Sequence, residues 1–466
     1  MTTTAPPIPT ETPVDWVRQR LFKNWWSGLV TLVLLPIVIY GGYRALRFFF
    51  VTGQWEAVQV NLALFMQGTF PRDQQWRLVT QILFFALAFG VGIGTASAAA
   101  KDRAEDAGLP YERGSLADTL KRMWSLVFFI ALLLLFATID DEGSLAGPFL
   151  VVAGTVVVSY AGYQVYRLPR RWRNLGWLIT LTLLILGFQV VSGFDAGGWV
   201  PLGIIFGFAA YSAVPAERFE SLWVRTGLRL AAGVVVAVAI RIVYAAVNIP
   251  GIGWDKWSGL HLTLMVSALA IVLAFPLGLL LALARRSTLP ALRVMSTAYI
   301  ELIRGVPLIS LLFMGQFILG LMLPAGTALS DITRAIAAMT LFTAAYVAEI
   351  VRGGLQSLPL GQTEAGQALG MGQATIMRRI VLPQALRAVI PAMVGQFISL
   401  FKDSSLLFII GILEFLGVRK IIHSQELFRA SGIAETLVFV AIGYWAFAFA
   451  MSRESQRLER RLRVSR

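Results

Sequence analysis

The stretch GLHLTLMVSALAIVLAFPLGLLLALAR, residues 259–285, contains a single charged side chain, Arg285, and that residue is its last. A helix needs about 20 predominantly apolar residues to cross the hydrocarbon core of a lipid bilayer. The stretch therefore predicts a membrane-spanning helix.

The composition of the whole chain extends this interpretation. Of the 466 residues, 57% are hydrophobic and 14% are charged, and the mean hydropathy is +0.71. Soluble domains are roughly 45–50% apolar and about 25% charged, and they rarely expose large apolar patches. The composition excludes a soluble enzyme, a disordered regulator and a fibrous repeat, and it favours an integral membrane protein.

Apolar stretches of sufficient length recur along the chain. The fold class that they predict is all-α, a polytopic transmembrane helical bundle of about 12 spans. The predicted spans are 27–47, 78–100, 123–139, 146–165, 176–193, 198–214, 226–248, 258–284, 305–323, 334–351, 384–412 and 433–451.

The basic residues predict the orientation. The chain has 40 Lys and Arg against 26 Asp and Glu, a net charge of +14. With a cytoplasmic N-terminus, about 28 basic residues fall inside, about 9 outside and about 3 within spans, the bias that the positive-inside rule describes. Residues 1–26 and 452–466 are then cytoplasmic tails, and the charge indicates topology rather than binding of nucleic acid.

Several kinds of chemistry are excluded. The chain has no cysteine and only two histidines, His261 and His423, so neither a thiolate nor a multi-histidine metal centre is expected. The phosphate-binding pattern G-x-x-x-x-G-K-[ST] does not occur. Gly90, Gly92 and Gly94 indicate close helix packing instead. We expect no catalytic residue and no cofactor bound by this chain.

One hydrophilic segment, 352–383, is more than a linker: RGGLQSLPLGQTEAGQALGMGQATIMRRIVLP. It predicts a short helix around Glu364 that Gly370 and Gly372 interrupt. Pro383 is expected to open the next span, where its missing N–H has no cost. A short helix between breakers can dock in a groove of another protein; the alternatives are a connector or a helix on the lipid surface.

The spacing within this segment resembles the conserved loop of ABC-transporter permeases of the binding-protein-dependent import type. That pattern is Glu-Ala-Ala, three residues, Gly, nine residues, Ile-x-Leu-Pro. The matching residues here are Glu364, Ala365, Gly366, Gly370, Ile380, Leu382 and Pro383. The departure is Gly366 where the family usually has Ala, which removes a methyl group and loosens a helix by about 1 kcal/mol.

Flanking stretches resemble the polar amino-acid permeases within that class. They include YIELIRGVPLISLLF (299–313), AAYVAEIVRGGLQSLPLGQTEAGQALGM (344–371) and VLPQALRAVIPAMVGQFISLFKDSSLL (381–407). KNWWSGLVTLVLLPI (23–37) and FPRDQQWRL (70–78) resemble the extended start of the longer permease subunit in bacterial general L-amino-acid importers. The resemblance implies a five-span, type I permease core at 258–451, preceded by an extension of about seven spans at 27–257.

The resemblance also implies partners and a mechanism. A separate ATPase dimer uses ATP and Mg and drives alternating access through the loop 352–383. A second permease subunit and an external solute-binding protein complete a transporter for amino acids in the bacterial inner membrane. In this interpretation Glu364 holds the loop helix, while Ala365, Gly366 and Gly370 allow close approach, and Pro383 passes motion into the next span.

The substrate pathway is predicted from charged and polar groups on core spans, because such groups default to functional hypotheses. Glu301 with Arg304, and Glu349 with Arg352, are spaced to pair on one helix face, which favours structural pairing. Lys402 and Asp403 lie deeper, and both a gate or pathway role and a packing role remain open for them. The pathway candidates are Lys402, Asp403, Glu349, Tyr346 and Thr263.

An ion-coupled secondary transporter of small polar solutes is the alternative function. Many such carriers have two similar halves. Here the first half has no counterpart of the segment 352–383, which favours the importer.

Overall fold

The computed structural model describes residues 17, 20–108, 110, 118, 146–168, 175–193, 199–213, 222–247, 250–253, 256–322 and 329–464. All named secondary-structure elements in these ranges are helices. One isolated β-bridge between described residues joins Gly259 to Glu414. The predicted all-α class is confirmed for the described part of the chain.

Within the described residues, eight of the predicted spans coincide with helices that are long and apolar enough to cross a membrane, so the predicted total of about 12 is not confirmed. They are α2 (Trp25–Arg47), α5 (Gln75–Asp106), α8 (Ala146–Tyr163), α12 (Leu222–Val247), α13 (Gly259–Arg285), α17 (Asp331–Gln356), α20 (Leu382–Asp403) and α22 (Ile433–Val464). Two more, α10 (Gly176–Ser192) and α11 (Trp199–Ala213), are apolar but shorter. The predicted span 123–139 lies outside the described residues.

The predicted span 305–323 coincides with a helical run over residues 308–322, but the helix that precedes it was not predicted. Helix α14 (Pro290–Gly305) occupies what was expected to be a connector, and it meets α15 (Leu308–Phe313) at an angle of 106°. The helical run then continues through the π-turn Met314–Ile318 into α16 (Leu319–Met322). Pro307 explains the break, because proline pushes the preceding residue out of the helical region, and Val306 has φ −106° and ψ 136°.

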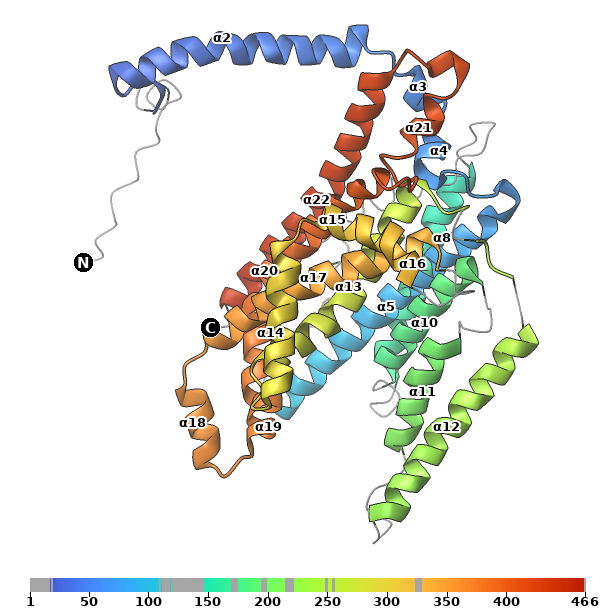
Figure 1. The fold of residues 1–466 in the computed structure, drawn as a ribbon, viewed down its shortest axis with the longest axis vertical. Coiled ribbons are helices and arrows are strands. Elements are labelled where there is room, and N and C mark those ends of the chain that lie inside the picture. The colour runs from blue at the N-terminus through green and yellow to red at the C-terminus, as the bar shows by residue number, and fades with distance from the viewer. Residues whose placement is uncertain are drawn as a thin grey trace.

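The core is built around α17. This helix packs along α13 on one side and against α20 on another, while α14 and α22 flank the group (Figure 1). Two glycines make the contacts close. A Cβ at Gly278 of α13 would lie 2.7 Å from the carbonyl oxygen of Ala344, and one at Gly354 of α17 would lie 2.4 Å from Val389 Cγ1. Small residues at such contacts let helices in membranes pack backbone to backbone.

The extension forms a second packed group from α5, α8 and α10. A Cβ at Gly90 would lie 2.0 Å from the carbonyl oxygen of Ser159, and one at Gly94 would lie 2.5 Å from that of Tyr163. The close-packing role is therefore confirmed for these two glycines. Helix α2 has no buried residue, and it runs away from the bundle (Figure 1).

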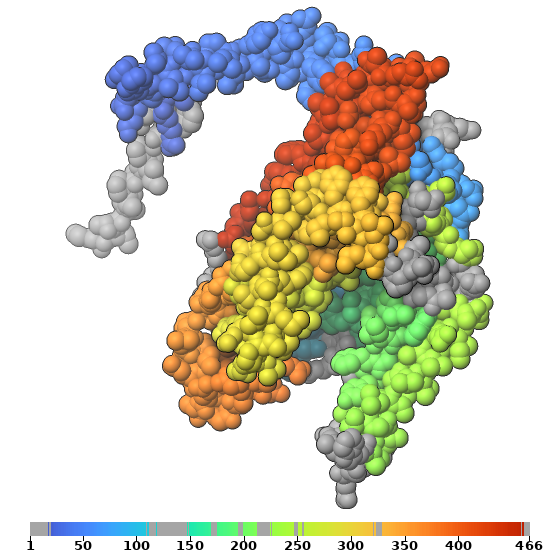
Figure 2. All heavy atoms as spheres, in the orientation of Figure 1, coloured from blue at the N-terminus to red at the C-terminus, as the bar shows by residue number. Residues whose placement is uncertain are grey.

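Extension and core meet at the end of the bundle that carries α3 (Glu56–Gln59) and α4 (Leu62–Gln67). In Figure 2 the blue surface of these early residues meets the red surface of the residues around the start of α22. The Thr69 amide donates to Ser258 Oγ at 2.6 Å, Gln425 donates to Asn61 at 3.0 Å, and the Gln54 amide donates to Glu435 at 2.8 Å. A buried apolar cluster also joins Phe65 of α4 to Leu260 of α13.

The contact between α17 and α20 can be tested at adjacent glycines. We expect Gly354→Ala to lower stability by about 1–3 kcal/mol, the usual cost of overpacking, because its Cβ also meets the Ala385 carbonyl oxygen at 2.9 Å. A methyl group at Gly353 would enter open space, so Gly353→Ala serves as the control. Thermal unfolding in detergent measures both; equal midpoints for the two variants would contradict the close contact.

Candidate functional site

Residues 357–381 connect α17 to α20, and we call them the candidate coupling segment. It consists of α18 (Gly361–Ala368), α19 (Gln373–Ile376) and the π-turn Met377–Val381. It projects from the bundle at the end opposite α3 and α4 (Figure 1). Gly370 has φ +72°, a left-handed conformation that glycine adopts without strain. The predicted interruption of the helix at this glycine is confirmed.

The motif residues divide between an exposed and a buried side of α18. Glu364 and Ala365 are exposed, and Gly366 is buried. Two apolar side chains, Leu360 and Leu369, are 77% and 79% exposed on either side of Glu364. The segment therefore presents an exposed carboxylate and two exposed leucines, a combination suited to contact with a protein partner.

The rest of the motif lies where the segment returns to the bundle. Gly370 is exposed, Ile380 and Leu382 are half-buried, and Pro383 is exposed. Pro383 is the second residue of α20, so it lies at the start of that helix as predicted; the difference from the prediction is that a helical run already begins at Gln373 and continues to Phe408. The π-turn before it accounts for the difference: the Leu382 amide donates to the Met377 carbonyl oxygen. Such turns accommodate local changes in the helical hydrogen-bond ladder.

The departure of Gly366 from the family pattern has a structural counterpart. A Cβ at Gly366 would lie 2.8 Å from Ile376 Cγ1 and 3.0 Å from its Cδ1. Ile376 is 1% exposed, so its side chain fills the place that a methyl group at residue 366 would need. The side chain of Ile376 on α19 thus occupies the space that the missing methyl group would take. This contact is separate from the effect of glycine on the helix propensity of α18.

An apolar cluster fixes the inner side of the segment to the core. Ile376 and Val381 are buried together with Ala282 of α13, Ile300 of α14 and Val351 of α17. Apolar burial of this kind couples the position of the segment to that of three helices, because closely packed interiors transmit displacements.

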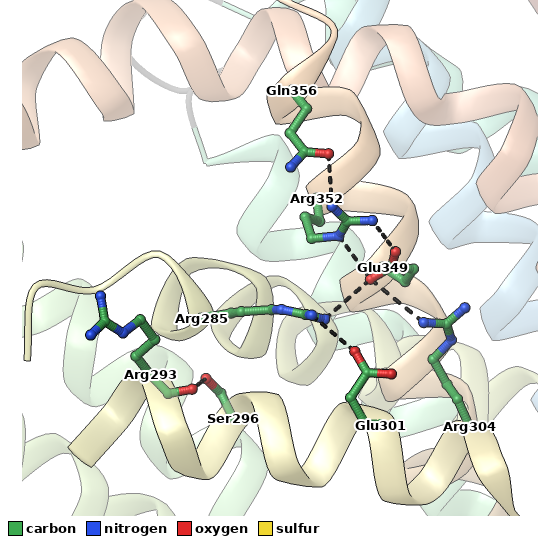
Figure 3. A network of polar contacts seen from close by, with 8 residues as sticks. All are labelled: Arg285, Arg293, Ser296, Glu301, Arg304, Glu349, Arg352 and Gln356. Carbon is green, nitrogen blue, oxygen red and sulfur yellow. Dashed lines mark hydrogen bonds and ion pairs between the residues drawn. The ribbon is translucent and has the colours of Figure 1, made fainter. Parts of the chain in front are cut away.

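A network of charges lies next to this cluster (Figure 3). Glu349 of α17 accepts hydrogen bonds from Arg352, at 2.9 Å for the Nε–Oε2 pair, and its Oε2 is 3.4 Å from Arg285 Nη1 and 3.7 Å from Arg304 Nη1. Arg285 also pairs with Glu301 at 2.9 Å. The predicted pair Glu349–Arg352 is confirmed.

The predicted pair Glu301–Arg304 is wrong. No ion pair joins these two side chains, both of which the structure describes; each binds a residue of another helix instead. The i,i+3 spacing permits only a weak local pair, and Arg285 and Glu349 offer partners across the helix contacts.

The remaining pathway candidates lie apart from this network, except Tyr346, whose ring centre is 5.7 Å from Arg304 Cζ. Thr263 is fully buried, donates to the Gly259 carbonyl oxygen at 3.2 Å and accepts from the Phe415 amide at 3.0 Å. Lys402 is exposed and Asp403 is half-buried at the end of α20. The structure therefore places Tyr346 and Glu349 at the same arginine, and Lys402, Asp403 and Thr263 elsewhere in the core.

Glu414 is a residue that the sequence analysis missed. It is fully buried in the loop after α20, where its carboxylate accepts from the Leu416 and Gly417 amides and from the Tyr444 hydroxyl, each at 2.8 Å. Burial raises the pKa of the Glu414 carboxyl, and these hydrogen bonds offset part of that rise. The resulting pKa is about 7. The sequence does carry a signal for this buried carboxylate, because Glu414 is the single glutamate within the apolar stretch 405–418.

Comparison with known proteins agrees with the features of this segment and core. Residues 274–464 match the family described as the binding-protein-dependent transport system inner membrane component. The inner membrane amino-acid ABC transporter permease protein YhdY of Escherichia coli is 46% identical over 212 residues, which are 45% of this chain and 57% of that protein. This chain thus aligns with little more than half the length of that relative.

A second relative is similar over a longer part of the chain. The glutamate/glutamine/aspartate/asparagine transport system permease protein BztC of Rhodobacter capsulatus is 38% identical over 312 residues, 64% of this chain and 69% of that protein. A solved structure described as an amino acid ABC transporter with histidines is 32% identical, with a TM-score of 0.40, over 44% of this chain and 92% of that one.

The helical core and its projecting segment define a multi-pass membrane permease. The chain belongs to the family of binding-protein-dependent ABC-transporter permeases of the inner membrane, and its resemblance to the polar amino-acid permeases is confirmed.

The contact between Gly366 and Ile376 predicts a compensating pair of substitutions. Gly366→Ala alone should displace Ile376 and lower the thermal stability of the chain by about 1–3 kcal/mol. Adding Ile376→Val should recover part of that loss, because it removes the Cδ1 methyl. Gly361→Ala is the control, since nothing lies within contact distance of a Cβ there. Strictly additive effects of the two substitutions would contradict the contact.

Proposed function

We propose that this chain is the translocation subunit of an ABC importer that takes up amino acids, driven by a separate ATPase. The projecting coupling segment is the observation that carries the proposal. It presents Glu364 and Ala365 outward, between Leu360 and Leu369. The sequence contains no phosphate-binding motif, which supports hydrolysis of ATP, with Mg, by a partner ATPase dimer.

The proposed mechanism begins with the ATPases docked on α18. When they close, they displace the coupling segment, and the displacement passes through Ile376 and Val381 to α13, α14 and α17, which share an apolar cluster with them. Two such permease subunits then alternate between outward and inward openings by rigid-body movement. The orientation predicted from the charges, with both termini cytoplasmic, places the coupling segment on the ATPase side of the membrane.

The proposed substrate is an amino acid, delivered by an external solute-binding protein. A zwitterion needs a hydrogen-bond donor or cation for its carboxylate and a carboxylate or carbonyl oxygen for its ammonium group, and charged residues within spans are functional hypotheses by default. Lys402 and Asp403 supply both charges at adjacent positions, and neither forms an ion pair with another described residue. Tyr346 and Thr263 remain proposed pathway residues, while Glu349 has arginines at both carboxylate oxygens.

The energy source distinguishes an importer from an ion-coupled carrier. We expect cells that carry the chain and its transporter partners to accumulate a radiolabelled amino-acid mixture, and a deletion strain to lose that uptake. Orthovanadate, which inhibits ABC ATPases, should abolish uptake in proteoliposomes loaded with ATP, whereas a protonophore should leave it intact. Uptake that a protonophore abolishes and that needs no ATP would contradict the proposal. Glu364→Ala, at the docking face, should reduce both uptake and ATPase co-purification.

A further inference from the structure

Glu349 occupies an unusual position among the charged residues of the core. Its carboxylate binds arginines from three helices: Arg285, the last residue of α13; Arg304 of α14; and Arg352 of α17 itself (Figure 3). The Glu349 side chain is 22% exposed, so these ion pairs are shielded from water more than surface pairs are. Charges that form a network in fixed geometry contribute to stability, whereas isolated surface ion pairs contribute little.

The network carries one net positive charge, and it would carry two without the Glu349 carboxylate. Three arginines face two glutamates, Glu349 and Glu301, and Glu301 pairs only with Arg285. Removal of the Glu349 charge leaves Arg304 and Arg352 close together with no carboxylate of the network between them. Like charges at short range repel, so the ends of α14 and α17 would be pushed apart.

The network reaches the start of the coupling segment. Arg352 donates to Gln356 at 2.7 Å, and Gln356 is the last residue of α17. On its other side the network is continuous with the apolar cluster, because Val347, Ala348 and Val351 of α17 are buried there with Ile376 of the segment. One helix therefore carries both the charged hub and the apolar contact to the segment.

We propose that Glu349 is a positioning residue that makes the ends of α13, α14 and α17 one rigid body with the coupling segment. The inference rests on the proposed function, since it describes how a displacement of that segment reaches the spans. It assigns to Glu349 a role in energy coupling rather than in contact with the substrate.

Spin-label distances test the rigid body directly. The chain has no cysteine, so labels can be placed at Leu302→Cys on α14 and Ala374→Cys on α19, two exposed side chains that lie outside the proposed docking face. In the full transporter complex in lipid nanodiscs, double electron–electron resonance should give one narrow distance that ATP with orthovanadate does not shift. With Glu349→Gln the distribution should broaden and shift with nucleotide.

Transport measured per ATP hydrolysed provides a second readout. For Glu349→Gln we expect this ratio to fall about tenfold, within the usual range for coupling between sites, while ATP hydrolysis continues. Glu301→Gln is the matched control: it removes only the Arg285–Glu301 pair and should retain the narrow distance and most of the ratio. Arg304→Gln, which breaks the ion pair between α14 and Glu349, should broaden the distance and lower the ratio to a smaller extent, because it creates no repulsion between Arg304 and Arg352; it replaces Glu349→Gln if that variant does not fold.

The outcomes separate this inference from the function on which it rests. An unsubstituted complex that couples ATP hydrolysis to uptake, together with unchanged distances and an unchanged ratio in both Glu349→Gln and Arg304→Gln, would overturn the role of Glu349 alone. An unsubstituted complex that accumulates no amino acid from a radiolabelled mixture with ATP would overturn the proposed function. A narrow distance that ATP shifts in the unsubstituted complex would also overturn the rigid body.

Discussion

The structure depends on the close approach of α17 to its two neighbours. Gly278 lets α13 touch the backbone of α17, and Gly354 lets α17 touch α20. Membrane helices gain little from apolar burial alone, because lipid is as apolar as their side chains, so association relies on close packing and interhelical polar contacts. Close packing and interhelical polar contacts occur together at one end of the core. The glycine contacts adjoin the apolar cluster around Ile376 and the arginines around Glu349 there.

This arrangement explains how the coupling segment, which is not itself a membrane-spanning helix, can displace the helices that are. The coupling segment is exposed on one side of α18 and buried on the side of Ile376 and Val381. Its exposed side can receive a partner, while its buried side belongs to the same cluster as α13, α14 and α17. At the opposite end, hydrogen bonds and apolar contacts join the extension to α13 and α22, so the core is held by the extension where it is far from the coupling segment.

Much of the fold could be predicted from the sequence because hydrocarbon imposes a simple length rule. Apolar stretches of sufficient length identified the eight helices that fit a membrane span in the described part of the chain, and the spacing of Glu364, Gly370 and Pro383 identified the segment. The bend between α14 and α15 was missed because hydropathy does not register the local effect of Pro307. The partners of Glu301 and Arg304 were missed because sequence spacing reveals neighbours on one helix only. Glu414 was missed because its amide and hydroxyl donors come from a loop and a distant helix.

The central claim is that the outer side of the coupling segment docks on an ATPase, and site-directed cross-linking measures this directly. Cysteine introduced as Leu369→Cys in the otherwise cysteine-free chain and labelled with a benzophenone maleimide, which needs no cysteine on the partner, should form a photo-cross-link to the ATPase in intact membranes. Val60→Cys, 66% exposed beside α3 at the other end of the molecule, should form none. A cross-link from Val60→Cys with none from Leu369→Cys, in a complex that retains uptake, would contradict the account.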